Sequence, residues 1–319
     1  MKRDRSISTL CHCFLFIVLS LYAIDANTAS LYEAIELTTS YIVKHQNADG
    51  GWPLVPGQES DVEITAFAIQ ALVTKGWGTG SKVIRRGVAY LRHRQRPDGS
   101  WNGNTAHTIF VLVALNYAET DPKARLKGLN WLKDVQNEDG SWGAQKLQPG
   151  DPVYTGAVIA GLRWLNFKQS YTPASKAADW LANPNRMNPD GGWSRFRGQS
   201  SDLFVTSWVL QGLSIAYDID AQIAWLKQAQ NEDGGFGKRK GGASDPEITA
   251  YAIMALAAGQ DPLNADKLAI GYLRAVQQAD GSFISATPIE LKEPTANLQT
   301  TCFALLAIHA RKIEDKLDK

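Results

Sequence analysis

A seven-residue phrase that recurs six times constrains the fold of this chain more than any other feature. Residues 46–52 read QNADGGW. The other five copies are QRPDGSW from Gln95, QNEDGSW from Gln136, MNPDGGW from Met187, QNEDGGF from Gln230 and QQADGSF from Gln277. The copies lie roughly 40 to 50 residues apart, which is the period of one supersecondary unit. The chain is therefore predicted to be a repeat protein.

Each copy is predicted to form a tight loop that follows a helix. Glycine accepts a positive φ and Asp can hydrogen-bond its own backbone, so Asp-Gly and Gly-Gly steps favour turns. The Trp or Phe that ends each copy is interpreted as an anchor that buries its ring against a neighbouring unit. A ligand stacked on each ring is the alternative interpretation.

Helical segments of two kinds alternate along the chain. Segments of mixed polarity, predicted to be outer helices with one solvated face, span 31–45, 82–94, 124–135, 174–181, 221–229 and 264–276. More apolar segments, predicted to be inner helices, span 64–73, 108–117, 155–165, 205–215, 248–258 and 300–310. No sustained two-residue alternation predicts strands. We expect an all-α fold, a single (α/α)6 toroid of six outer and six inner helices. An open solenoid is the alternative, but it needs polar capping repeats at its ends.

The amino terminus has the features of an export signal. Three basic residues, Lys2, Arg3 and Arg5, precede an apolar run over 10–23. We expect residues 1–29 to be a signal peptide, with an uncleaved membrane anchor as the alternative, and residues 30–319 to form the toroid. The protein is expected to be periplasmic or secreted, with membrane-surface association as an open question. Cys302 would be the one cysteine of the mature chain, which allows no internal disulfide.

The overall charge argues against a nucleic-acid partner. The net charge is +1, and no basic stripe accompanies it. With 44% hydrophobic residues, the chain has ample material for a packed core.

The inner helices share a starting pattern, an Asp or Asn four positions before a Thr. The pairs are Asp61 and Thr65, Asn104 and Thr108, Asp151 and Thr155, Asp202 and Thr206, and Asp245 and Thr249, with Ala296 before Thr300 in the sixth unit. Asp and Asn are preferred N-caps. In a closed ring, these caps would surround one mouth of a central cavity.

Only some units carry polar residues just inside these helix starts. Glu63 and Glu247 lie two positions before the Thr, and His107, Tyr154 and Gln299 lie one position before it. Structural demands repeat from unit to unit, whereas functional ones need not. This asymmetry marks the candidate site.

The repeats resemble the QxxxGxW repeats of the prenyltransferase and squalene-cyclase superfamily, whose members are α/α toroids. The resemblance covers essentially the whole chain after residue 29. DVEITA at 61–66 and DPEITA at 245–250 are similar to the DxDDTA motif of class II terpene cyclases, whose middle Asp protonates a double bond or epoxide. Glu63 or Glu247 would replace that Asp, while Ile64 or Ile248 replaces the next one.

The resemblance also extends to zinc-dependent prenyltransferases, which place ligands at the same helix starts in an Asp-x-Cys pattern with a His. Asp245 matches, but Glu247 stands where Cys would and Gln299 where His would. We therefore expect no metal and no cofactor.

The leading hypothesis is a terpene-cyclase-like isomerase that cyclises an isoprenoid, or another apolar ligand, by acid initiation in the central cavity. We place the acid on Glu63 with His107 as its neighbour, keep Glu247 in reserve, and interpret Asp61 and Asp245 as caps or supporting partners. The predicted ligand-contacting residues are Phe67, Phe110, Tyr154, Phe204, Trp208, Tyr251, Gln299 and Phe303. Aromatic faces attract passing cations.

Two other functions stay open. A non-catalytic exported carrier or interaction toroid could hold an apolar ligand in the same cavity, and the incomplete DxDD motif favours it. GGWP at 50–53 also resembles a phrase of one family of secreted pectate lyases. Such a lyase needs basic residues in a groove, and those near repeat loops are Arg195, Arg197, Lys238, Arg239 and Lys240.

Overall fold

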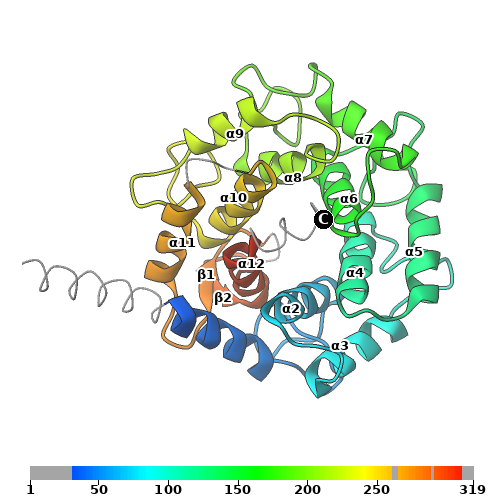
Figure 1. The fold of residues 1–319 in the computed structure, drawn as a ribbon, viewed down its shortest axis with the longest axis vertical. Coiled ribbons are helices and arrows are strands. Elements are labelled where there is room, and N and C mark those ends of the chain that lie inside the picture. The colour runs from blue at the N-terminus through cyan, green and yellow to red at the C-terminus, as the bar shows by residue number, and fades with distance from the viewer. Residues whose placement is uncertain (1–30, 261–264, 289–290, 311–319) are drawn as a thin grey trace, which may run out of the picture.

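Twelve helices alternate between an inner and an outer ring in the computed structural model, which describes residues 31–260, 265–288 and 291–310 (Figure 1). The inner helices are α2 (Val62–Lys75), α4 (Thr105–Tyr117), α6 (Pro152–Trp164), α8 (Leu203–Leu213), α10 (Pro246–Ala258) and α12 (Leu298–Ile308). The outer ones are a helix over residues 31–44, α3 (Lys82–His93), α5 (Pro122–Asp134), α7 (Thr172–Ala182), α9 (Asp220–Lys227) and α11 (Ala265–Val276). This confirms the predicted toroid.

The ring closes between its last and first units. α12 packs against both α10 and α2. The Nε2 atom of Gln277, in the sixth repeat loop, donates to Ala34 O at 2.9 Å and to Thr38 Oγ1 at 2.6 Å in the first outer helix. The Leu298 N–H donates to Leu54 O at 2.8 Å. Closure, rather than an open solenoid, is therefore confirmed.

The repeat aromatics anchor their loops as predicted. Trp52 is fully buried, its ring Nε1 donates to Ile42 O at 2.7 Å, and its backbone N–H donates to Thr65 Oγ1 at 2.9 Å. The corresponding rings, all buried, are Trp101, Trp142, Trp193, Phe236 and Phe283. The recurring Thr therefore serves the loop, not the cavity.

The Gln that begins five of the six phrases joins neighbouring units, as does the first Gly, whereas the fourth phrase begins with Met187. Gln46 Nε2 donates to Val83 O, at the start of the next outer helix, at 2.9 Å. Gly50 has a φ of +95°, and a Cβ there would lie 2.5 Å from Arg86 O in the same helix. Only glycine meets both conditions without strain.

A short hairpin before the last inner helix departs from the all-helical prediction. β1 (Phe283–Ser285) and β2 (Thr295–Asn297) pair antiparallel between α11 and α12. Strands of three residues are too short to show an alternating pattern in the sequence.

The hairpin shifts the register of the sixth unit by one residue. The Phe283 N–H donates to Thr301 Oγ1, and Asn297 is the N-cap of α12. The prediction that Ala296 and Thr300 form the sixth pair is therefore wrong. The aromatic and its Thr are 13 residues apart in the first unit and 18 in the sixth, and the added residues form the hairpin.

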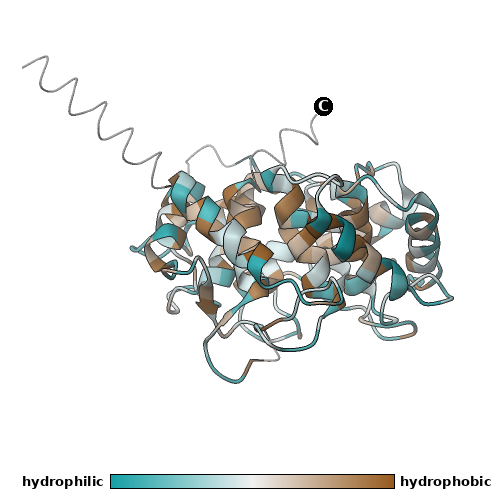
Figure 2. Cartoon of the chain, turned by 90° about the horizontal axis from the view of Figure 1, so that it is seen from below, coloured by the Kyte–Doolittle hydropathy of each residue, from teal (hydrophilic) through white to brown (hydrophobic). Residues whose placement is uncertain are grey.

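Seen edge-on, the helices form one layer, and the long loops extend from one side of it (Figure 2). No helix among the described residues combines the length and the apolar character that a bilayer crossing needs. The predicted export segment, residues 1–29, lies outside the described residues. Cys302 is buried, and burial raises the pKa of its thiol, so it acts as a small core residue.

Candidate functional site

A cavity of about 300 Å³ opens where the six inner helices begin. Each inner helix lines it with the residue two positions after its N-cap, and we call these six residues the entrance ring. Its members are Glu63, Ala106, Val153, Phe204, Glu247 and Gln299. Because the sixth register is shifted, Gln299 lies level with Glu63 and Glu247, not one position later as predicted. The volume is at the lower end of the range for small-molecule pockets, roughly 300–1,000 Å³.

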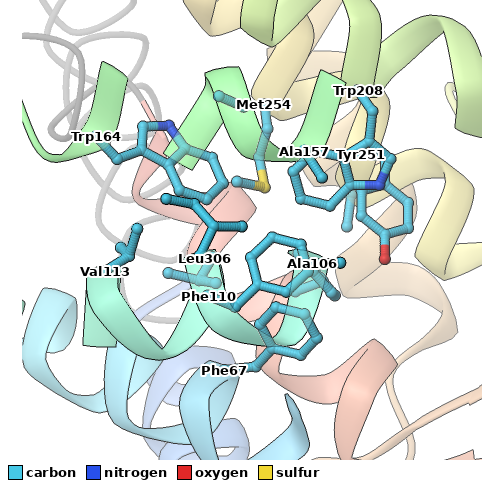
Figure 3. Packing of buried hydrophobic residues seen from close by; sticks show 14 of the residues in the cluster. Phe67, Ala106, Phe110, Val113, Ala157, Trp164, Trp208, Tyr251, Met254 and Leu306 are labelled. Atoms are coloured by element: carbon cyan, nitrogen blue, oxygen red, sulfur yellow. The ribbon is translucent and has the colours of Figure 1, made fainter. Parts of the chain in front are cut away.

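Aromatic rings pack together one helical turn deeper, where all but one of them line the cavity, and we call them the aromatic layer. They are Phe67, Phe110, Trp208, Tyr251 and Phe303. Neighbouring ring centroids are 4.5 to 5.4 Å apart, and in Figure 3 the four labelled rings of this layer crowd toward one another. Ala157 holds the equivalent place on α6. Phe303 supports the layer from behind, since it packs on Phe67 and Tyr251 but does not line the cavity.

Glu247 is a fully buried carboxyl group in the cavity wall. Its Oε1 accepts hydrogen bonds from Gln299 Nε2 at 2.7 Å and from the Tyr251 hydroxyl at 3.3 Å, and its Oε2 accepts from Thr300 Oγ1 at 2.5 Å. Burial raises its pKa from 4.5 to about 7, against the lowering effect of the bonds from Thr300 and Gln299. Near neutral pH, the protonated acid is thus a major species.

The hairpin and α12 build the surroundings of Glu247. Asp245, the N-cap of α10, accepts hydrogen bonds from Ser285 Oγ at 2.8 Å and Thr287 Oγ1 at 3.0 Å, both from the sixth unit. Its negative charge also raises the pKa of Glu247. Sequence reasoning missed Thr300, Ser285 and Thr287 as parts of the site because their roles depend on the hairpin.

Glu63 and His107 meet across the boundary between α2 and α4, as predicted. Glu63 Oε2 lies 3.5 Å from His107 Nε2, and the two side chains are 26% and 22% exposed. The Asn102 amide lies 3.0 Å from His107 Nδ1. When Asn102 donates in this contact, the ring proton is on Nε2 and points toward the Glu63 carboxylate.

Asp61 and Asp245 do not line the cavity. Asp61 Oδ1 accepts from the N–H groups of Glu63 and Ile64, and Asp245 Oδ1 accepts from those of Glu247 and Ile248. Both are N-caps, and they place the Glu two residues later on the entrance ring.

Two basic residues complete the cavity wall, Arg195 and Lys238. Arg195 Nε lies 2.7 Å from Asp151 Oδ2, and its guanidinium lies 5.7 Å from the centre of the Tyr154 ring. Lys238 Nζ lies 3.9 Å from Asp202 Oδ2. Tyr154 and Phe204, both predicted to contact a ligand, line the same cavity.

Across the described ranges, no three His, Cys, Asp or Glu side chains come together in a way that could hold a metal ion.

The family model of the squalene-hopene cyclase C-terminal domain matches residues 56–158 and 155–288. Drimenyl diphosphate synthase of Streptomyces showdoensis is 30% identical over 57% of this chain and 35% of its own length. Squalene–hopene cyclase of Bradyrhizobium diazoefficiens is 33% identical over 34% of this chain and 21% of its own length. The chain thus matches about a third or less of each relative.

Among solved structures, the type II terpene cyclase MstE from Scytonema superimposes with a TM-score of 0.69. The match covers 88% of this chain and 98% of MstE at 15% identity, which shows a shared fold. A protein described as a glycosidase has the same ring, with a TM-score of 0.63 and 16% identity. The ring therefore occurs in proteins with different descriptions.

Proposed function

Because the chain belongs to the squalene-hopene cyclase C-terminal domain family, we propose that its cavity cyclises a small isoprenoid by acid initiation, with Glu247 as the acid. One observation carries this proposal: Glu247 is fully buried beside the aromatic layer, and its pKa is raised to about 7. A carboxylic acid that keeps its proton near neutral pH is what protonation of an alkene requires.

In the proposed first step, the Glu247 O–H bond breaks and its proton adds to one carbon of a terminal double bond. The π electrons form the new C–H bond, and the other carbon becomes a tertiary cation. A second double bond of the same chain attacks this cation and closes a ring. Loss of a proton from a neighbouring carbon restores a double bond, so the product is an isomer of the substrate.

The aromatic layer suits the cation that this sequence creates. Phe67, Phe110, Trp208 and Tyr251 line the cavity. A desolvated cation over the face of such a ring gains about 2 kcal/mol or more. The cavity volume of about 300 Å³ favours a short isoprenoid over a long one.

We assign Glu63 and His107 to the removal of the final proton. The raised pKa of Glu247 suits the acid of the first step, and a second group at the cavity is needed as the base of the last step. Glu63 lies partly in solvent beside the Nε2 atom of His107, which suits a carboxylate that accepts a proton and passes it to water. This assignment reverses the order expected from the sequence, in which Glu63 was the first choice for the acid and Glu247 the reserve.

The relatives support the proposal in two ways. Drimenyl diphosphate synthase and squalene–hopene cyclase are the kinds of protein to which the sequence is similar. MstE is matched over 98% of its length, so a single ring has the size of a protein described as a type II terpene cyclase.

The test is turnover of a panel of C10 to C20 prenyl alcohols and prenyl diphosphates in D2O. An acid-initiated reaction places one deuterium on the carbon that Glu247 protonates, and mass spectrometry of the product detects it. Glu247→Gln should lower the rate by about a thousandfold or more, because it removes the general acid and leaves its site otherwise similar in shape. Glu63→Gln is the matched variant, because it removes a carboxyl group from the same cavity and keeps Glu247. Deuterium should still enter its product.

Two outcomes would favour the other functions. Binding of a prenyl chain without turnover, and with equal affinity in Glu247→Gln, would identify a carrier. Cleavage of polygalacturonate with formation of an unsaturated end would identify a lyase.

A further inference from the structure

The two basic residues of the cavity wall come from neighbouring repeat loops. Arg195 lies in the loop before α8 and contacts Asp151, the N-cap of α6. Lys238 lies in the loop before α10 and approaches Asp202, the N-cap of α8. Both cations thus lie over the starts of α6 and α8.

These positions place the cations across the cavity from the Glu63 carboxylate. The inner helices follow one another around the ring in chain order, so α6 and α8 lie opposite α12 and α2. Glu63 and Gln299 occupy that opposite side of the entrance ring. One side of the cavity mouth therefore carries two cations beside the carboxylates of Asp151 and Asp202, and the other side carries Glu63 and Gln299 without a Lys or Arg in the cavity wall.

The architecture does not require cations at these junctions. The start of α4 joins the next loop through Thr105 Oγ1, which donates to Gly143 O at 2.7 Å. Asp245, the cap of α10, is bound by the hydroxyl groups of Ser285 and Thr287. Neutral groups make the same junction elsewhere, so the Arg and Lys at these two adjacent junctions are not needed to join the units. Their positive charge therefore points to a ligand.

Both cations retain capacity to bind a ligand. The Lys238 side chain is 71% exposed, and its ammonium lies 3.9 Å from Asp202, beyond the usual hydrogen-bond distance. Arg195 uses Nε for Asp151, and a guanidinium has further N–H donors on its two terminal nitrogens. The Arg195 side chain is 39% exposed.

We propose that Arg195 and Lys238 bind the anionic head group, a phosphate or carboxylate, of an isoprenoid whose tail rests on the aromatic layer. This inference rests on the proposed function and adds the chemical class of the substrate. A guanidinium and an ammonium together match the several oxygens of such a group. The head group is bound and not cleaved, because acid initiation acts on a double bond of the tail.

The experiment measures binding by isothermal titration calorimetry in the Glu247→Gln protein, which prevents turnover. The probes are farnesyl diphosphate, farnesoic acid, farnesol and inorganic diphosphate. Each is titrated into that protein and into its Arg195→Gln and Lys238→Gln versions. Arg239→Gln is the matched control, because Arg239 neighbours Lys238 in the same loop but does not line the cavity.

We expect at least one charged prenyl probe to bind about tenfold or more tightly than farnesol, because a charge-assisted hydrogen bond contributes that much. Arg195→Gln and Lys238→Gln should each weaken that probe by about tenfold and leave farnesol within about twofold, whereas Arg239→Gln should change neither. The comparison of farnesyl diphosphate with farnesoic acid then identifies the head group.

Equal binding of charged and neutral probes, unaffected by either substitution, would overturn the head-group site and leave Arg195 and Lys238 as partners of Asp151 and Asp202. Cyclisation of farnesol by the wild type would still support the proposed function in that case. If no prenyl probe binds and none is turned over, both proposals fail together.

Discussion

Two corners of the ring, the starts of α2 and α10, have nearly the same six residues, but their Glu side chains lie in different environments. DVEITA begins α2 and DPEITA begins α10, each with an Asp cap and a Glu on the entrance ring. Yet the Glu63 side chain is 26% exposed, and Glu247 is fully buried. The local motif places the carboxyl group, and the neighbouring unit decides how deeply it is buried.

The neighbours differ for a structural reason. Beside Glu63, α4 follows its repeat loop directly, and Trp101 is only seven residues from Thr108. Beside Glu247, a hairpin precedes α12 and delivers Thr300 as a further hydrogen-bond donor. A helix N-terminus favours the ionised carboxylate at both corners, but burial outweighs it at Glu247.

The largest effect expected from this difference is on the pH dependence of stability. The pKa of Glu247 is raised by folding from 4.5 to about 7, so its favourable contribution is complete below pH 4.5 and is lost as the pH rises through 7. The free energy of unfolding of Glu247→Gln, measured relative to the wild type, should therefore rise by about 3 kcal/mol from pH 4 to pH 8. Urea unfolding at a series of pH values measures it.

Glu63→Gln is the control for that series. It keeps Glu247, so the loss of stability that Glu247 causes as the pH rises through 7 should remain. A Glu247→Gln curve with the same slope as the wild type would contradict a raised pKa of Glu247 in the folded state.

A smaller effect is expected from Thr300→Val. The hydroxyl group of Thr300 stabilises the carboxylate form of Glu247, so its removal should raise the pKa of Glu247 further, by about 1. The alkaline limb of the pH–rate profile should move to higher pH by the same amount. Thr301→Ser is a suitable control because it keeps the hydroxyl group that accepts from Phe283.

The smallest effect expected is a difference in stability between variants of the two N-caps, Asp61 and Asp245. Asp61→Ala should lower the free energy of unfolding by about 1 kcal/mol, as for a typical N-cap. Asp245→Ala should cost about 1 kcal/mol more, because it also leaves the hydroxyl groups of Ser285 and Thr287 without their acceptor. Thermal or urea unfolding of the two variants tests this order, and equal losses would show that the hairpin adds nothing to the fifth-unit cap.

Much of the ring could be predicted because its determinants are local and repeated. Each of the six phrases carries its own turn and its buried ring, and five of them carry the Gln that binds the next outer helix. The entrance-ring positions of Glu63 and Glu247 follow from the distance to their Asp caps. The meeting of Glu63 with His107 followed from the adjacency of consecutive inner helices.

The sixth unit could not be predicted in the same way. The residues added between Phe283 and Thr301 fold into a hairpin too short for a periodic signal, and the position of Gln299 was therefore expected one residue away from where it lies. Thr300 looked like a repeat residue, but it is the hydrogen-bond donor to Glu247 Oε2.

The sequence by itself determined the repeat, the closed ring and the level at which two carboxyl groups face one cavity. Those features depend on turns, caps and helical spacing, which act over a few residues. Only the tertiary structure decided that Glu247 is the buried carboxyl group of the two and that Arg195 and Lys238 lie opposite Glu63. Burial and charge separation depend on side chains far apart in the chain, and closure of the ring brings them together.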